Sequence, residues 1–196
     1  MRLVAFRKRL IRIIFERCNM EFQKLIEVRR SVRDYKNELI DHDTLVSILK
    51  QAQMAPSWKN QQTSRVYALE TAECLDELRE KILPSFNAKS SSGACLLITT
   101  FVKDVVGFGP DGTPTNELGN YWGAYDLGLH DAYMVLAAAN EGYDTLIMGI
   151  RNEEVIREAL KIPENEVIVS VIALGKRNQE PSLRPRKELD EVVRFY

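Results

Sequence analysis

The segment that most constrains the fold is residues 132–139 (AYMVLAAA), within a helical pattern that runs from about residue 121 to 141. These residues are apolar on every side of a helix. Such a helix has to be buried all round, either in the core or against a second subunit. Gly142 then stops the helix, as glycine often does. The rest of the chain must therefore supply layers that cover this helix.

Two apolar runs supply candidates for a central sheet. Residues 94–102 (ACLLITTFV) and 166–174 (EVIVSVIAL) are rich in β-formers and apolar on both faces, as central strands are. Shorter strands are expected at 65–69 and 145–150, and 84–93 and 107–119 are expected to be loops. Strands mixed with helices indicate an α/β layered domain. The remaining helices are expected at 20–28, from Asp41 or Asp43 to just before Pro56, at 72–83, after Asn152, and only after Pro185 in the tail.

Composition excludes several classes of function. The 196 residues suit one domain, and a net charge of −1 gives no general attraction to nucleic acid or acidic membranes. No apolar run reaches the roughly 18 residues of a membrane span. Two histidines leave little material for a zinc centre or a histidine triad. Cys18, Cys74 and Cys95 lack metal-type spacing and are typical of reduced thiols, so a cytoplasmic location is expected.

The first 19 residues differ from the rest. They are rich in arginine, contain one acid, and place apolar residues at helical spacing. They could be a targeting peptide or a membrane-surface helix. They could equally be an extra docked helix, an expression remnant, or sequence upstream of a start at Met20. The domain boundaries are therefore set at 1–19 for a basic amphipathic extension and 20–196 for a single domain with a C-terminal arm.

Residues 27–35 (EVRRSVRDY) concentrate positive charge beside valines. If the segment is extended, Arg29, Ser31 and Arg33 share one face, while Val28 and Val32 turn towards the core. Guanidinium groups bind phosphate through paired hydrogen bonds, and a serine hydroxyl can add another. The alternative is a solvated basic turn after a helix.

Several motifs resemble the nitroreductase family of FMN-dependent oxidoreductases. The basic segment RRSVRDY is followed by residues 55–60 (APSWKN), then by 137–149 (AAANEGYDTLIMG), a helix that ends in a glycine turn. Residues 152–163 and the closing RPRKEL continue in family order, so the match covers about 20–193. Each motif is weak alone, but five in order are specific. The resemblance implies an α+β fold: a homodimeric, nitroreductase-like α/β/α sandwich with a mixed, mainly antiparallel central sheet.

The resemblance also implies that FMN binds in two interface clefts, with NADH or NADPH as electron donor. Arg29, Ser31 and Arg33 resemble residues that hold the phosphate, ribityl chain and pyrimidine edge, and Arg186 and Arg184 a basic pair that closes on the phosphate. The other candidates are Arg30 in the same segment, Pro56, Ser57 and Asn60 in a loop from the partner subunit, Met148 and Gly149 near the flavin N5, and Asn87 beside the ring.

Other roles remain open for some of these residues. Asn60 and Asn87 could be turn residues, Arg184 a solvated charge, and Gly149 the end of a strand. Two departures also affect the match. Residues 61–64 are QQTS where many relatives have Gln-Pro-Trp, and Ile150 stands where many have a second glycine.

The mechanism expected is ping-pong transfer from NAD(P)H through FMN to a nitroaromatic, quinone or similar small acceptor. No catalytic side chain is required, because the flavin does the chemistry; Arg33 is the candidate to stabilise the anionic reduced flavin. The alternatives are a specialised relative (flavin-destroying, dehalogenating or peptide-oxidising), a flavin carrier or redox sensor without turnover, and an anion or membrane-surface binder acting through residues 1–19.

Overall fold

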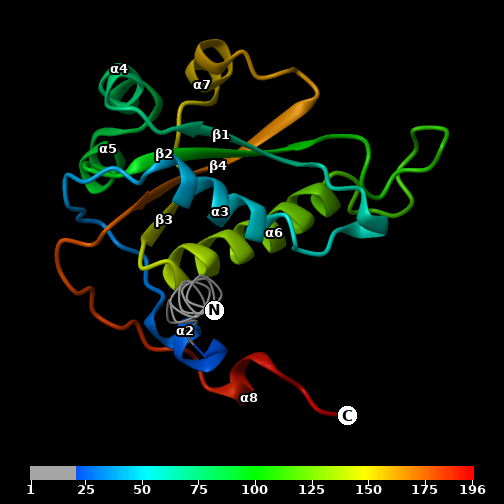
Figure 1. Cartoon of the computed structure of the whole chain (residues 1–196). Helices are drawn as coiled ribbons and strands as arrows, with labels where there is room; N and C mark the ends of the chain where they lie inside the picture. The colour runs from blue at the N-terminus through cyan, green and yellow to red at the C-terminus, as the bar shows by residue number, and fades with distance from the viewer. Residues whose placement is uncertain (1–20) are drawn as a thin grey trace, which may run out of the picture.

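A computed structural model describes residues 21–196; the sequence predictions for residues 1–19 and for a start at Met20 lie outside this range. Its centre is a four-stranded sheet in the order β1-β2-β4-β3, with every neighbouring pair antiparallel (Figure 1). The strands are β1 (Ser64–Leu69), β2 (Cys95–Val102), β3 (Asp144–Met148) and β4 (Glu166–Gly175). The two apolar runs of the sequence form the central strands β2 and β4, and the side chains of β2 are buried almost throughout.

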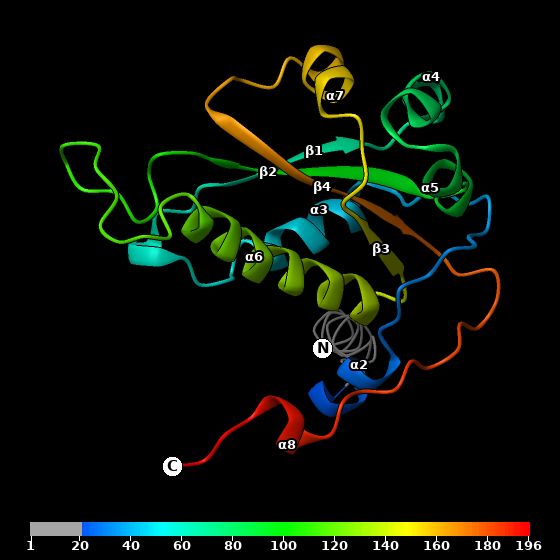
Figure 2. The ribbon, with the colours of Figure 1, turned by 180° about the vertical axis from the view of Figure 1, so that it is seen from behind.

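Helices cover both faces of the sheet, as Figures 1 and 2 show from opposite sides. The α/β/α sandwich expected from the sequence is confirmed. One layer contains α3 (His42–Ala52) and α6 (Tyr121–Asn140), with α2 (Phe22–Val28) against α6. The other contains α4 (Ala72–Ile82), α5 (Ser85–Ser90) and α7 (Glu153–Leu160). A 3-10 turn, η1 (Trp58–Asn60), precedes β1, and α8 (Leu189–Val192) lies in the C-terminal arm, residues 181–196.

Side-chain caps fix where the main helices begin. Asp41 is the N-cap of α3 and accepts a hydrogen bond from the Thr44 amide at 2.9 Å. Asn152 caps α7 by accepting from the Val155 amide at 3.3 Å. Each cap satisfies an amide that the helix itself leaves without a partner. The sequence predicted both positions, although it left Asp41 and Asp43 as alternatives.

The expectation of a loop at 84–93 is wrong, because this stretch contains α5. The helix is short and polar, and its stability comes from a neighbour. The Arg79 guanidinium, on α4, donates to Ser91 Oγ at 2.9 Å and to the Ala94 carbonyl at 2.7 Å. These bonds hold the end of α5 against the start of β2. Strand β3 also ends at Met148, two residues earlier than expected.

Among residues 21–196, helix α6 has one buried side and one exposed side. Met134, Ala137 and Ala138 pack into the core shared with α3 and the sheet. The opposite side is exposed yet apolar, and its members follow helical spacing: Tyr121, Tyr125, Gly128 and Ala132. Tyr121 and Tyr125 are 74% and 60% exposed. Burial in the core thus accounts for half of this helix, and burial against a second subunit stays a prediction. No helix within residues 21–196 has the length and apolarity to cross a membrane.

Candidate cofactor site

The basic segment after α2 is extended, which is the case in which the sequence placed Arg29, Ser31 and Arg33 on one face. Val28 does not turn into the core as expected: it ends α2 and is only partly buried. Ser31 forms a parallel bridge with Thr145 of β3, and the Val32 amide donates to the Thr145 carbonyl at 3.0 Å. This bridge gives the otherwise antiparallel sheet a parallel partner. Val32 is buried while Ser31 and Arg33 are exposed. The valine therefore anchors the segment and leaves polar side chains on the open side.

Two arginines from opposite ends of the chain lie near each other. Arg29 is partly buried, and burial is the main cause that lowers its pKa; the charges of Arg186 and Arg30 lower it further. We call these three residues the arginine cluster. Among residues 21–196, none of the three forms an ion pair with a carboxylate. Repulsion that no acid offsets favours the binding of an anion.

The other two candidate cations, Arg33 and Arg184, lie beside the arginine cluster in sequence and are exposed, as Arg186 is. Arg33 donates to the Ser31 carbonyl at 3.4 Å and is exposed. Arg184 is exposed, and its carbonyl accepts a hydrogen bond from Arg186 Nη1 at 3.1 Å. The charge of Arg186 thus acts on Arg29, and Arg33 and Arg184 are their neighbours in sequence.

A second group of candidates meets where β3 ends. Asn87 of α5 donates from Nδ2 to the Ile150 carbonyl at 3.0 Å, which ties α5 to the turn that contains Gly149. Met148 is buried, and a Cβ added to Gly149 would meet nothing within 4 Å. The backbone of Gly149 is thus open to close approach. Gly149 lies four positions after Thr145, the bridge partner of Ser31, so this turn is about 13 Å along the strand from Ser31.

The loop with Pro56, Ser57 and Asn60 is not brought to the arginine cluster within one chain. It lies near the N-terminal end of α6, whereas α2 lies near the opposite end (Figure 1). The loop is held by Asp126 of α6, whose carboxylate accepts from the Trp58 amide at 2.8 Å. Such a separation is compatible with a loop that serves the partner's site.

The backbone of this loop adopts unusual conformations. Lys59, Asn60 and Gln62 have positive φ angles of 49°, 57° and 49°. Non-glycine residues seldom adopt this region, and asparagine does so most readily. The Gln62 amide donates to Ser57 Oγ at 3.1 Å and helps to close the turn.

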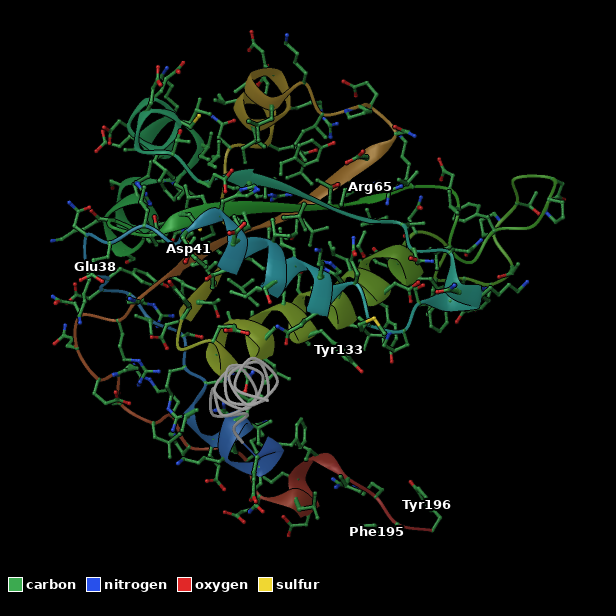
Figure 3. All side chains as sticks on the ribbon, in the orientation of Figure 1. Glu38, Asp41, Arg65, Tyr133, Phe195 and Tyr196 are labelled. Atoms are coloured by element: carbon green, nitrogen blue, oxygen red, sulfur yellow. The ribbon has the colours of Figure 1, made fainter. Side chains whose placement is uncertain are left out.

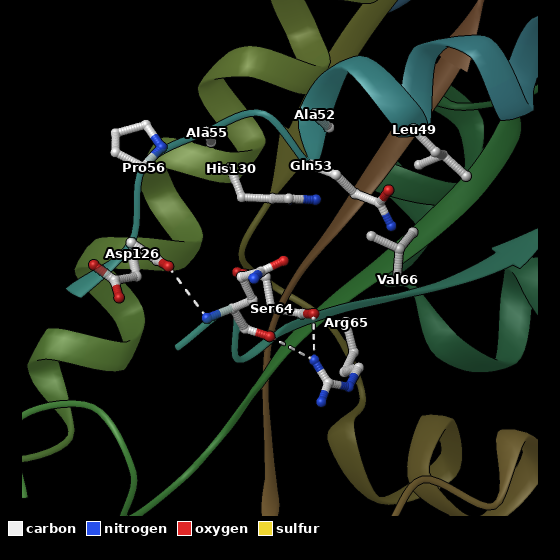
Figure 4. A pocket seen from close by; sticks show the side chains of 12 residues that line it. Leu49, Ala52, Gln53, Ala55, Pro56, Ser64, Arg65, Val66, Asp126 and His130 are labelled. Carbon is white, nitrogen blue, oxygen red and sulfur yellow. Dashed lines mark hydrogen bonds between the residues drawn. The ribbon is translucent and has the colours of Figure 1, made fainter. Parts of the chain in front are cut away.

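A cavity of about 390 Å³ opens beneath the loop, between α3, β1 and α6 (Figure 4). Asp126 and His130 line it from α6, and Arg65 lines it from β1. Burial raises the pKa of Asp126, and the hydrogen bond from Trp58 opposes this change. Arg65 is engaged with backbone, because its Nη1 donates to the carbonyls of Gln62 and Ser64 at 2.9 Å each.

Sequence reasoning missed the polar residues that organise these regions. Asp126, His130 and Asp131 interrupt an apolar helix, which was a visible signal, and all three are buried. His130 Nδ1 lies 3.2 Å from Asp131 Oδ1. The ion pair between Asp144 and Arg177 was also missed. Its only signal was a charge at the start of a predicted strand.

Comparison with known proteins identifies the family. The model of the nitroreductase family matches residues 26–94 and 110–176. A protein of Archaeoglobus fulgidus, provisionally named NADH dehydrogenase/NAD(P)H nitroreductase, is 30% identical over 169 residues, covering 82% of this chain and 87% of its own.

Solved structures agree. A nitroreductase family protein of Clostridium novyi is 26% identical with a TM-score of 0.69, covering 88% of this chain and 91% of its own. A provisionally named nitroreductase of Exiguobacterium sibiricum, solved in complex with FMN, is 20% identical with a TM-score of 0.78, covering 90% and 98%. The chain described here belongs to the nitroreductase family of oxidoreductases.

Proposed function

We propose that the protein is an FMN-dependent oxidoreductase that passes electrons from NADH or NADPH to a nitroaromatic, quinone or similar small acceptor by a ping-pong mechanism. The observation that carries the proposal is the arginine cluster, in which the charge of Arg186 acts on the partly buried Arg29 and none of the three members forms an ion pair among the described residues. The FMN bound to the E. sibiricum neighbour, and the NAD(P)H in the name of the A. fulgidus relative, support this reading.

The donor set of the site fits a phosphate. A phosphate monoester carries close to two negative charges, and guanidinium groups bind it through paired hydrogen bonds. Arg29 and Arg186 would hold the phosphate, and the exposed Ser31 hydroxyl would add a donor. Arg30, Arg33 and Arg184 would add positive charge around them. Because Arg29 is partly buried, each bond it makes there is stronger than in water.

The turn after β3 would receive the other end of the cofactor. The backbone of Gly149 is accessible, and Met148 anchors the turn in the core. Asn87 fixes the turn through its hydrogen bond to the Ile150 carbonyl. Phe86 and Ile150 beside these residues are exposed apolar side chains that a planar ring would cover. Bound FMN supplies the redox chemistry, and the chain's own residues orient it and exclude water.

A homodimer would complete the site. The exposed stripe of α6 is apolar, and an uncovered apolar helix face of this length is typical of a subunit interface. The C-terminal arm also projects from the body and ends in exposed Phe195 and Tyr196 (Figure 3). Pairing through α6 would let Pro56, Ser57 and Asn60 of one subunit reach the FMN of the other.

The test is to replace both Arg29 and Arg33 with alanine and measure the flavin that co-purifies. Loss of phosphate contacts should release FMN and abolish NADH oxidation with a quinone. Arg65→Ala is the matched control, because this exposed arginine bonds only to nearby backbone. A yellow, fully loaded and active double variant would reject the assignment. Wild-type protein that binds FMN but never oxidises NADH or NADPH would instead be a flavin carrier or redox sensor.

A further inference from the structure

A buried ion pair joins the start of β3 to the segment that follows β4. The Arg177 guanidinium donates two hydrogen bonds to the Asp144 carboxylate, from Nε to Oδ2 at 2.9 Å and from Nη2 to Oδ1 at 2.5 Å. The Arg177 amide donates to Oδ2 as well, at 3.2 Å. The Asp144 side chain is only 7% exposed and that of Arg177 25%. The geometry is therefore a bidentate, charge-assisted pair of the strong kind.

The same guanidinium also contacts both segments that supply the arginine cluster. Its Nη2 donates to the Val28 carbonyl at 3.4 Å, one residue before Arg29. Its Nη1 pairs with Glu180 at 2.6 Å, at the beginning of the chain that leads to Arg186. Arg177 thus touches the end of α2, β3 and the base of the C-terminal arm.

Backbone hydrogen bonds reinforce this junction. Tyr35 and Arg177 form an antiparallel bridge. The Lys36 amide donates to the Lys176 carbonyl at 2.9 Å, and the Asn178 amide donates to the Asp34 carbonyl at 3.0 Å. The chain at 34–36 therefore runs beside the chain at 176–178. Any shift of one segment would displace the other.

Stability alone is a poor explanation for this pair. Removing two charges from water costs about as much as their attraction returns, so apolar replacements are often as stable. Arg29 and Arg186, in contrast, repel each other and need a fixed frame to stay close before any anion arrives. A group that fixes such a frame improves affinity by lowering the cost of ordering the site.

We propose that Asp144 and Arg177 are positioning residues, which set the spacing between the Arg29 segment and the Arg186 segment and thereby select ligands that carry a terminal phosphate. The inference rests on the proposed function and deepens it. It assigns to this pair the preference for FMN over riboflavin, which has the same ring but no phosphate. In this role the pair would act through the two segments and not through a contact with the flavin or the substrate.

The test is the double variant Asp144→Leu/Arg177→Met, which removes both charges of the pair together. Glu180 loses its partner, but its side chain is 77% exposed and stays in water. Full-length protein freed of flavin is titrated with FMN and, separately, with riboflavin, and binding is followed by flavin fluorescence. The Kd for FMN should rise about tenfold or more, while that for riboflavin changes less than about twofold. The melting temperature reports separately on stability.

Arg157→Met is the matched control. Arg157 also pairs with an acid, Glu153, at 3.0 Å and donates to the Glu166 carbonyl, but it lies in the opposite helix layer. This variant should lose stability and keep the FMN-to-riboflavin ratio of the wild type. If the preference for FMN over riboflavin falls equally in Arg157→Met and in Asp144→Leu/Arg177→Met, the effect comes from a general loss of stability, and the proposal is overturned.

Each remaining outcome separates the two claims. A double variant that keeps the wild-type ratio overturns the positioning role while FMN binding stands. A wild type that binds neither flavin rejects the proposed function itself, and the positioning role with it. If the double variant does not fold, Arg177→Lys decides by the same ratio, because lysine keeps the charge and loses the planar fork.

Discussion

Gly123 illustrates how a single residue sets the approach of α6 to the sheet. A Cβ built there would lie 2.4 Å from Cδ2 of the Phe101 ring on β2, and both residues are buried. Gly123→Ala should therefore destabilise the fold by about 1–3 kcal/mol, the usual cost of overpacking a core. Urea unfolding measures the change.

A second substitution shows whether the clash is the cause. In the double variant Gly123→Ala/Phe101→Leu, leucine replaces the ring and leaves room for the new methyl group. The loss of stability should then be smaller than the sum of the losses in the two single variants. Strict additivity, or a Gly123→Ala variant as stable as the wild type, would contradict the close contact.

Residue patterns pointed to the segment that contains the candidate arginines, but they did not reveal the ion pair behind it. If residues 29–33 were extended, the period of two would bury Val32, and the structure shows both the extended backbone and the buried valine. Sequence could not show the link between Asp144 and Arg177, because periodicity carries no information about pairs 33 residues apart. The binding roles of the candidate arginines stay predictions until flavin is measured.

At the scale of elements, the sequence predicted the parts whose stability is local or strongly apolar. The central strands followed from their apolar runs, and α3 and α7 from their caps. Helix α5 was missed because its sequence has little helical character. The bonds from Arg79 to Ser91 and Ala94, which only the tertiary structure supplies, hold it in place. Intrinsic propensity is a weak guide in such segments.

The loop that contains η1 provides a prediction at the same scale. Two contacts attach it to α6: the bond from the Trp58 amide to Asp126 at 2.8 Å, and the packing of the Trp58 ring against the Trp122 ring, whose centroids are 4.9 Å apart. Three residues of the loop have positive φ. Asp126→Ala should loosen the loop, because it removes one of these two contacts from a segment whose backbone is already strained. Amide exchange at residues 57–62 should then speed up about tenfold, which corresponds to a loss of roughly 1.4 kcal/mol.

Asp126→Asn separates the hydrogen bond from the charge. Asparagine keeps an acceptor oxygen for the Trp58 amide, and burial already disfavours the charged form of Asp126. Exchange in this variant should stay close to that of the wild type. Equal acceleration in both variants would mean that the carboxylate charge, and not the hydrogen bond, holds the loop.

At the scale of the whole molecule, two exposed apolar surfaces within residues 21–196 bear on assembly. One is the apolar stripe of α6, and the other is the C-terminal arm with Phe195 and Tyr196 at its end (Figure 3). Core packing determines the α/β/α layers from one chain, whereas these surfaces contribute to stability only when another surface covers them. This is why the apolar segment 132–139 could predict burial but could not distinguish the core from a second subunit.

Ala132→Glu tests whether a second copy of the chain covers the stripe. Ala132 is exposed in one chain, so glutamate costs the isolated fold little. In a dimer that pairs through α6 it would bury two unpaired charges, at a cost on the order of 3 kcal/mol or more. Sedimentation should show a wild-type dimer and a folded monomeric variant that retains little FMN. Ala72→Glu is the control, because it makes the same change at an exposed position of α4, and this variant should stay dimeric. If the Ala132 variant remains a flavin-loaded dimer, the subunits meet through some surface other than α6.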